Sequence, residues 1–508
     1  MKQKDPEERM KRMRWLVILV GLGLAGAACT KAQGDAATVG LDAQAQTDSE
    51  VADVAVDPAA NEPTFDPKLL RTSDAIAPVR EFVVKQGQIH GHSVFSHDAC
   101  DGSPRVNGET GARNEQCFWD FRDGICQTGL DVLFLTDHNA GLFCDYEYPE
   151  EFLYEPDQGD TLVLRDGAPV ANRLKCKDGH TMLLAPGFDN HNLVLGLEKH
   201  LRATSADRQT LYGTKSDAAF QEFRDSGHAL VAVAYVSDWD RAELAKYKWD
   251  GYEVFNPATT MKMHMGTMLS SIADFVNDPD NSPVPELAIL AVFEEGAANM
   301  QFWSDTVLRQ RVFNFIGPNA HRNSLPMEMA DGERGDSYRR LFHWFGNFFL
   351  LPKDQAATPD DRTYKDALAA GRVYNAFLFY GYPVGFDFHA TVGGKTYEMG
   401  AELQSAAGVT LHVSVPRVYG KLASGTIAPV ITAKILRAVT DGWEEVASDT
   451  KDYDFAVKTA GVYRVDVRIV PNHLKKFLGA TPEKYMAERS WVYSGTIYLG
   501  MPYSQPKP

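Results

Sequence analysis

Positive charge is scarce in this chain of 508 residues, which has 51 Lys and Arg against 68 Asp and Glu and a formal net charge of −17. Apart from a basic stretch near the amino terminus, residues 11–14, nothing offsets this balance. A nucleic acid held through its phosphates requires the opposite balance, so binding of nucleic acid by charge is excluded. The apolar run at residues 15–24 is also too short for a comfortable transmembrane span.

Cysteine is rare and unevenly distributed. Five of the six cysteines lie in one third of the chain, and none follows them: Cys100, Cys117, Cys126, Cys144 and Cys176. No pair has the Cys-x-x-Cys spacing that is typical of zinc sites. In an exported chain, these five cysteines predict up to two disulfides with one cysteine left over, and the sequence leaves their connectivity open.

The amino terminus has the order of a secretory signal: a basic region, an apolar run and then small residues at positions 25–28. Small residues directly before Cys29 resemble the bacterial lipobox, although Gly26 stands where a large aliphatic residue is usual. We therefore expect residues 1–29 to be a lipoprotein signal peptide with Cys29 as the lipidated residue, in preference to simple secretion or an uncleaved anchor. Thr30 and Lys31 show no acidic retention-type residue, which favours the outer membrane over the inner membrane of the cell envelope.

Lysine and arginine are absent from residues 32–67, where Ala, Gln and Thr predominate beside several acidic residues. Low hydrophobicity combined with charge of one sign does not support a packed core. The sequence thus predicts a disordered acidic tether over residues 30–74 and a folded region that starts near residue 75.

Two polar clusters organise the folded region. His90 and His92 stand two apart in a predicted strand, and residues two apart in an extended strand point to the same side. The second cluster follows a short apolar run, residues 132–135, that ends in Thr136, Asp137 and His138. A buried strand with polar groups at its carboxyl end is where barrels and doubly wound sheets carry their chemistry.

These two motifs resemble the signatures of the PHP (polymerase and histidinol phosphatase) superfamily of metal-dependent phosphoesterases. The first would comprise His90, His92 and either His97 or Asp98, and the second Asp137 and His138. The resemblance covers about residues 80–380. It implies an α/β fold, a distorted (β/α)7 PHP-type barrel over residues 75–383, with metal ions bound at the strand ends.

Further positions match this superfamily with departures. Asp189 stands where the family has a bridging glutamate, and His191 follows it as a candidate replacement for a missing ligand. Tyr235 replaces an expected histidine. In the segment that resembles the closing signature, Asn319 replaces an aspartate, whereas His321 is retained.

Glu253 and Asn256 occupy a strand end that the resemblance also covers, and their roles stay open between catalysis and hydrogen bonding to neighbouring loops. The pattern further predicts strands at residues 181–185, 229–234, 249–256, 287–292 and 312–316, and helices at 218–224, 259–276, 334–349 and 364–370. From residue 384 to 508, short alternating runs predict antiparallel strands packed as a β-sandwich-like domain. His389, His412 and His473 of this part are expected to be surface or core histidines.

A cluster of imidazoles and carboxylates at strand ends suits a divalent transition metal, Zn, Mn or Fe, in one to three ions. The expected ligands are His90, His92, Asp98 or His97, His138, Asp189 and His321, and the expected catalytic groups are Asp137, His138 and His191. The preferred hypothesis is an envelope-anchored phosphoesterase acting on a phosphoester-containing small molecule or envelope polymer. The alternative is a degenerate member that binds a metal or ligand without turnover.

Overall fold

The computed structural model describes residues 61–105, 111–139, 142–258, 284–291 and 293–501. All of them belong to one compact unit, Asp57–Pro508. The predicted signal peptide and its lipidated Cys29 lie outside the described residues, as does the predicted helix at 259–276. No helix in the described ranges is long and apolar enough to span a membrane.

The structure is mixed α/β and is built on a sheet of 13 strands. Strand β1 (Phe82–Gly91) lies in the middle of this sheet, parallel to β2 (Val132–Leu135) and antiparallel to β12 (Phe345–Pro352). On the β2 side the sheet continues through β6 (Thr181–Ala185), β5 (Ala168–Lys175) and β4 (Thr161–Arg165). On the β12 side it continues through β13 (Val373–Phe377), β24 (Arg489–Tyr493), β23 (Gly461–Val470), β25 (Ile497–Leu499) and β17 (Glu402–Leu403), with β20 (Val430–Val439) and β21 (Gly442–Asp449) paired beside β23.

A second sheet of six strands has the order β11 (Phe313–Ile316), β10 (Gly251–Phe255), β9 (Leu230–Val233), β8 (Asn192–Leu195), β7 (Phe188–Asp189) and β3 (Asp137–His138). Strands β2 and β3 are separated by one residue, so the chain passes from the first sheet to the second at this point. The described strands therefore hydrogen-bond in two main sheets, and a single seven-stranded barrel stays a prediction.

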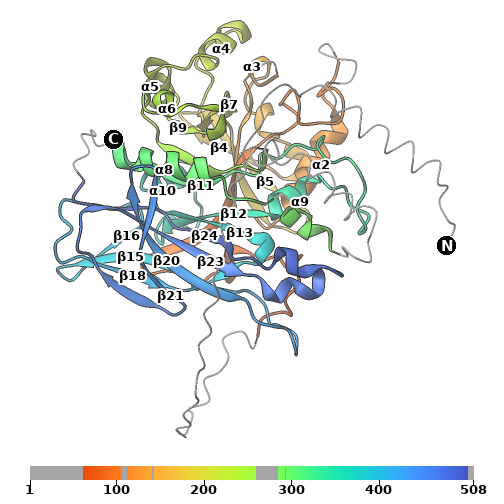
Figure 1. The fold of residues 1–508 in the computed structure, drawn as a ribbon. Helices are drawn as coiled ribbons and strands as arrows, with labels where there is room; N and C mark the ends of the chain where they lie inside the picture. The colour runs from red at the N-terminus through yellow and green to blue at the C-terminus, as the bar shows by residue number, and fades with distance from the viewer. Residues whose placement is uncertain (1–60, 106–110, 140–141, 259–283, 292, 502–508) are drawn as a thin grey trace, which may run out of the picture. The chain divides into compact units, whose positions relative to one another are not determined.

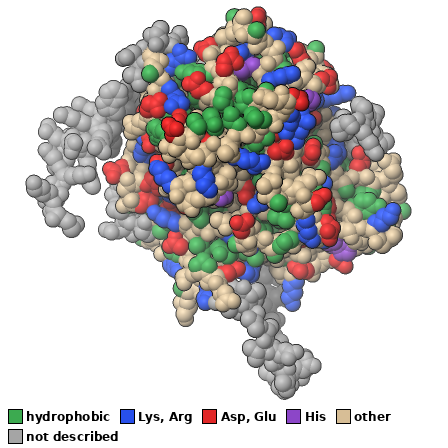
Figure 2. Space-filling model, turned by 180° about the vertical axis from the view of Figure 1, so that it is seen from behind, with side chains coloured by type: hydrophobic (Ala, Val, Ile, Leu, Met, Phe, Trp, Pro, Cys, Tyr) green, Lys and Arg blue, Asp and Glu red, His purple; other side chains and the backbone are tan. Residues whose placement is uncertain are grey.

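Helices flank these sheets (Figure 1): α2 (Glu115–Cys126), α3 (Leu142–Asp145), α4 (Ser205–Tyr212), α5 (Asp217–Asp225), α6 (Arg241–Leu244), α8 (Ala297–Arg309), α9 (Tyr338–His343) and α10 (Asp361–Ala369). Short 3-10 turns punctuate the chain: η1 (Ser73–Ala75), η3 (Glu150–Phe152), η4 (Pro156–Gln158), η5 (Val236–Asp238), η6 (Pro285–Ala291), η7 (Leu378–Tyr380), η8 (Asn472–Phe477) and η9 (Pro482–Tyr485). On the face in Figure 2, Lys and Arg side chains are interspersed with Asp and Glu.

The antiparallel strands predicted after residue 384 are present, and two small sheets accompany them. One pairs β14 (Pro383–Val384) with β19 (Arg417–Val418), and the other has the order β16 (Lys395–Glu398), β15 (Asp387–Val392), β18 (Thr410–Ser414) and β22 (Tyr453–Ala456). The blue strands in the lower part of Figure 1 belong to this region. Because β24 pairs with β13, hydrogen bonding of the large sheet crosses the predicted boundary at 383/384.

Two predicted elements are wrong. Residues 285–291 form the 3-10 turn η6 rather than a strand, because a short buried apolar run does not by itself distinguish the two. The predicted helix at 334–349 is only helical over Tyr338–His343 and then becomes β12, whose aromatic and leucine side chains are buried on both faces of the sheet.

The folded part also begins earlier than residue 75. Phe65 is 3% exposed and its ring packs against His473 and Phe477, while Glu62 pairs with Arg417 at 2.6 Å. The sequence around Phe65 is polar and does not predict this packing, because a single aromatic side chain makes the contact with the core. The predicted tether therefore ends before residue 74.

Buried asparagines join the two sheets. The Asn347 side chain in β12 accepts a hydrogen bond from the Ile316 amide at 3.0 Å and donates one to the Ile316 carbonyl at 3.0 Å. Asn375 in β13 donates to the Asn347 Oδ1 at 2.9 Å. The amide of Asn347 thus replaces a strand partner at the end of β11 and holds the segment after Ile316 against the central sheet.

Candidate metal centre

The polar residues of the two histidine signatures converge where parallel strands end. His90 lies in β1 and His92 follows that strand, while His138 and Asp189 lie in β3 and β7. The segments after β9 and β11 bring in Tyr235, Asn319 and His321, and β10 contributes Glu253. The site is thus assembled from segments spread over more than two hundred residues of sequence, as is usual at the carboxyl ends of parallel strands.

One group of candidate ligands consists of His92, Asp98, His138 and His321, each of which offers a donor atom within 4.8 Å of the others. His138 Nε2 lies 3.4 Å from Asp98 Oδ2, and His321 Nε2 lies 3.3 Å from Asp98 Oδ1. The His92 ring centroid is 4.6 Å from that of His138 and 4.1 Å from that of His321. Three imidazoles and one carboxylate suit a transition-metal ion.

Ser96, for which the sequence pattern predicts no role, orients this group. Its hydroxyl lies 3.2 Å from His92 Nδ1, accepts from the His138 amide at 3.2 Å and donates to Asp98 Oδ1 at 3.1 Å. Since the hydroxyl proton goes to Asp98, this network assigns the His92 proton to Nδ1 and leaves a lone pair on Nε2. The signal for Ser96 was its position two residues before Asp98.

The Nε2 atom of His92 is buried and has no hydrogen-bond partner among the described residues. An unpaired buried acceptor is costly, and a cation in contact with it removes that cost. Burial, followed by the charges of His321 and His138, lowers the pKa of His92 well below its usual value. The ring is therefore neutral, which is the form that binds metal. His92 accordingly fits a metal ion.

Asp98 has the complementary charge. Burial by itself would raise its pKa, but hydrogen bonds with His138 and His321 and the charges of these rings outweigh that effect and hold the pKa well below the usual range. The carboxylate is therefore ionised at neutral pH and available as a ligand.

A second group consists of His90, His92 and Asp189, all of them buried. Asp189 Oδ2 lies 3.6 Å from His90 Nε2, 3.9 Å from His92 Nε2 and 3.4 Å from His138 Nδ1. Because this oxygen faces imidazoles of both groups, Asp189 would be the ligand that two ions share if both groups held one.

Glu253 holds the His90 ring. His90 Nδ1 donates to Glu253 Oε1 at 2.5 Å, and Glu253 Oε2 accepts from Asn256 Nδ2 at 3.0 Å and from the Tyr235 amide at 3.1 Å. A Cβ atom on Gly317 would lie 2.2 Å from Glu253 Oε1, so glycine is required at this close approach. Glu253 thus orients the candidate ligand His90, and Asn256 orients Glu253.

The backbone at His90 departs from the extended strand that the sequence predicted. His90 has φ 77°, and the register between β1 and β2 shifts between Ile89 and Gly91. The rings of His90 and His92 do converge, with centroids 5.2 Å apart, but a bulge rather than plain strand alternation aims them. Left-handed backbone recurs at Tyr235 with φ 48° and at Asn319 with φ 47°, and such conformations cluster at functional sites.

Three predicted site residues lie outside these groups. The His97 side chain is 54% exposed, so Asp98 and not His97 joins the first group. His191 is 55% exposed at its side chain, and its Nδ1 atom lies 3.6 Å from Asp238 rather than among the ligand atoms. Asp137 is buried and accepts hydrogen bonds from the amide and hydroxyl of Ser93 at 2.5 and 2.7 Å.

Asp137 therefore supports the turn after His92 and does not face the ligand atoms of either group. Burial raises its pKa to about 7, against the lowering effect of the Ser93 hydrogen bonds. The expected catalytic role of Asp137 stays a prediction, since its contacts are to Ser93 and not to an imidazole.

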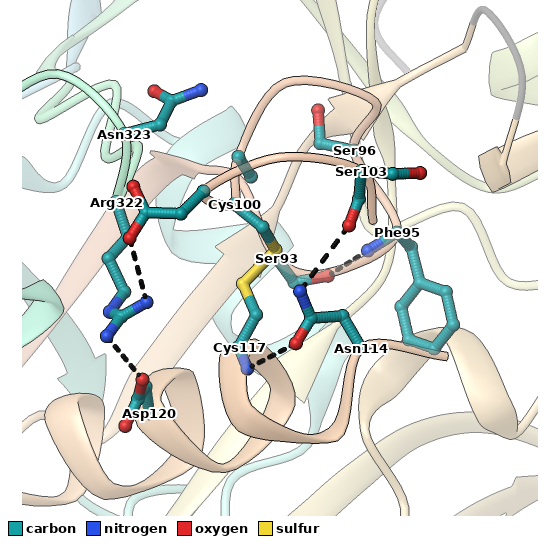
Figure 3. Close-up of a disulfide and its surroundings, with 12 residues drawn as sticks. Ser93, Phe95, Ser96, Cys100, Ser103, Asn114, Cys117, Asp120, Arg322 and Asn323 are labelled. Carbon is teal, nitrogen blue, oxygen red and sulfur yellow. Dashed lines mark hydrogen bonds and ion pairs between the residues drawn. A yellow bond between two sulfur atoms is a disulfide. The ribbon is translucent and has the colours of Figure 1, made fainter. Parts of the chain in front are cut away.

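A disulfide fastens the loop that carries Asp98. Cys100 and Cys117 form this bond, which ties the loop to the first turn of α2 (Figure 3). Cys126 and Cys176 form the second disulfide, and Cys144 is free and buried. The predicted count of two disulfides with one cysteine left over is confirmed.

No family model matches the chain, and no curated protein matches it. One similar solved structure is a crystal structure from Bacteroides vulgatus ATCC 8482 of a two-domain protein containing a predicted PHP-like metal-dependent phosphoesterase. It shares 13% sequence identity and covers 82% of this chain and 96% of its own, with a TM-score of 0.31.

Proposed function

We propose that this chain is a metal-dependent phosphoesterase with its centre at the carboxyl ends of strands of a PHP-type barrel. The observation that carries the proposal is the unpaired Nε2 atom of His92, buried among three further candidate ligands. A ring with a buried lone pair, beside an ionised Asp98, is arranged for a cation. The expected ligands are His90, His92, Asp98, His138, Asp189 and His321.

The chain's own residues supply the positioning that phosphoester hydrolysis needs. When bound, a divalent ion supplies Lewis acidity toward a phosphoryl oxygen and toward water. Ser96 and Glu253 hold the His92 and His90 rings with their Nε2 atoms toward the centre. Because Ser96 and Glu253 fix the orientation of these two rings, the arrangement of the ligand atoms stays the same through the reaction.

Lys215 supports an anionic substrate. Its ammonium group lies 4.7 Å above the Trp239 ring, and Trp239 donates from its indole to the carbonyl of His191 at 3.3 Å. Three residues before Lys215 in the sequence, the Tyr212 carbonyl accepts a hydrogen bond at 3.1 Å from the side chain of Asn190. Asn190 directly follows the candidate ligand Asp189. Trp239 thus links Lys215 to the segment that follows Asp189, and we infer that its ammonium group reaches a phosphoryl group bound at the centre.

Burial lowers the pKa of Lys215, and Asp189 is among the acidic groups whose charges act in the opposite direction. No ion pair of Lys215 occurs within the described part of the chain. Its charge is therefore available to a phosphate group.

The test compares wild type with His92→Ala. Removal of a neutral ligand should reduce the content of Zn or Mn and any phosphatase or phosphodiesterase activity together. The control is His228→Asn, at the opposite end of β9 and exposed, where asparagine tolerates the left-handed backbone. Metal binding without turnover of any phosphoester by the wild type would favour the alternative, a degenerate binding protein.

The proposal includes a location. We expect the mature chain to be exported and anchored to the bacterial envelope through a lipid on Cys29, with the outer membrane favoured, and a phosphoester in a small molecule or envelope polymer to be its substrate. Cys29→Ser should abolish lipoprotein processing and detergent partitioning. Unchanged partitioning of this variant would contradict the anchor.

A further inference from the structure

The hydroxyl group of Tyr235 lies among the candidate ligands. It is 3.1 Å from His90 Nε2, 2.9 Å from Asp189 Oδ2 and 3.1 Å from Asn319 Oδ1. The left-handed backbone at Tyr235 and Asn319 aims both side chains inward at the ends of their strands. Residues that the sequence comparison counted as lost ligands therefore still place oxygen atoms at the centre.

The hydrogen-bonding capacity of this cluster is incomplete. A phenol has one proton and can donate it to one acceptor. The Tyr235 hydroxyl faces two oxygen acceptors, the carboxylate of Asp189 and the amide oxygen of Asn319 as oriented in the structure. The phenol proton cannot serve both oxygens, and a cation would compensate the lone pairs that remain.

The spacing of the four atoms agrees with coordination. Four donors about 2.0–2.1 Å from a tetrahedral ion lie roughly 3.3 Å from one another. Four of the six separations lie between 2.9 Å, for Tyr235–Asp189, and 3.6 Å, for His90–Asp189. Hydrogen bonding explains each short contact singly, whereas one ion explains their convergence.

We propose that Tyr235 Oη and Asn319 Oδ1, with His90 Nε2 and Asp189 Oδ2, form a second cation position beside that of His92, Asp98, His138 and His321. Asp189 lies between the two positions. On binding, the oxygen of Tyr235 forms the bond to the ion and the phenol proton leaves to solvent, with no change of oxidation state. This assignment rests on the proposed metal-dependent function and extends its ligand set.

The two positions differ in chemistry. The first has three imidazoles and one carboxylate, which suits Zn²⁺, whereas the second has one imidazole and three oxygens, of which a phenolate is one. Oxygen-rich sets favour harder ions. We therefore expect the second position to prefer Mn²⁺ or iron over the ion held at the first.

The experiment uses the full-length chain loaded with Zn²⁺ or with iron. Tyr235→Phe keeps the ring, which lies 5.2 Å from that of His90, and removes only the oxygen. It should bind one equivalent of ion fewer than wild type while the first equivalent is retained. An Fe³⁺–phenolate pair absorbs visible light through charge transfer, so iron-loaded wild type should be coloured and Tyr235→Phe should lose the band.

Tyr397→Phe in β16 is the matched control and should change neither quantity. Tyr235→His should bind the second equivalent again without the charge-transfer band, since a nitrogen donor replaces the oxygen. The assignment would be overturned if Tyr235→Phe bound the second equivalent with the affinity of the wild type. It would also be overturned if the wild type bound only one equivalent of Zn²⁺ and only one equivalent of iron.

Activity measured on the same samples separates this inference from the proposed function. A hydroxyl-dependent second ion without phosphoester hydrolysis would leave the ligand assignment in place and reject the phosphoesterase. Phosphoester hydrolysis together with a second ion that does not depend on Tyr235 would support the phosphoesterase and reject the ligand assignment.

Discussion

Removing the Cys100–Cys117 disulfide should weaken the metal centre and the fold by different mechanisms. The bond closes a loop of 17 residues in sequence separation, and the chain-entropy relation assigns such a loop about 3 kcal/mol of stability. Cys100 stands two residues after Asp98, so the same change frees the loop that carries a ligand. The Ala99 carbonyl between them still accepts from the Arg322 amide at 2.9 Å and from the Tyr338 hydroxyl at 3.1 Å.

Because these two hydrogen bonds remain, we expect Asp98 to be loosened and not lost. Changes that only disturb the orientation of a ligand typically cost 10- to 100-fold in metal affinity, so Cys100→Ser/Cys117→Ser should bind Zn²⁺ about tenfold more weakly. Competition with a chromophoric chelator measures the affinity, and thermal unfolding measures the stability.

The second disulfide is the matched control. Cys126–Cys176 closes a separation of 50 residues, for which the same relation gives about 4 kcal/mol. Cys126 ends α2 and Cys176 precedes β6, so this bond lies at the amino end of the strand, away from the candidate ligands. Cys126→Ser/Cys176→Ser should therefore lose more stability and little metal affinity. Equal loss of affinity in both variants would refute the reasoning.

Two further predictions concern charge at the centre. Lys215→Met should raise the KM for a phosphoester about tenfold with a smaller effect on metal content, because a charged hydrogen bond contributes about 1.5–3 kcal/mol; an unchanged KM would exclude Lys215 from substrate binding. His90 is buried, which lowers its pKa, but Glu253 and Asp189 outweigh burial and raise it to about 9 in the metal-free chain. Because this pKa exceeds the unfolded value of about 6.5, His90 should contribute up to about 3 kcal/mol below pH 6.5, and this contribution should be lost as the pH rises through 9. Thermal unfolding of the metal-free chain should show that decline, and His90→Gln should remove it.

Much of the centre could be predicted from local sequence. His138 and Asp189 end short strands, and His92 and His321 lie in segments that follow strands; the strands at 132–135 and 181–185 have the predicted bounds. Parallel strands bring their carboxyl ends together. If the ends of the strands are identified correctly along the chain, these side chains are therefore already expected to lie near one another. Their convergence in two groups is what this local pattern implies.

The partners of the ligands could not be predicted in the same way. Ser96 and Glu253 act through hydrogen bonds to rings whose positions depend on a bulge at His90 and on the close approach at Gly317. Neither feature has a sequence pattern of its own. The contacts of Tyr235 could not be predicted for a related reason: matching residue types position by position shows a missing imidazole but not that the hydroxyl reaches the cluster through a left-handed backbone.

The C-terminal strands contribute to the scaffold of the centre, which changes how the predicted boundary at 383/384 is understood. Strand β12 pairs with β1, which carries His90, and Asn347 of β12 holds the Ile316 backbone just before the segment of Asn319 and His321. On its other edge β12 pairs with β13, and β13 pairs with β24 beyond the boundary. Removal of residues 384–508 would therefore leave β13 as an unpaired edge two strands from β1. Strands that support His90 and the segment of Asn319 and His321 in this way are part of the same folded unit as the candidate metal centre, and their sequence is constrained by it even though they contribute no candidate ligand.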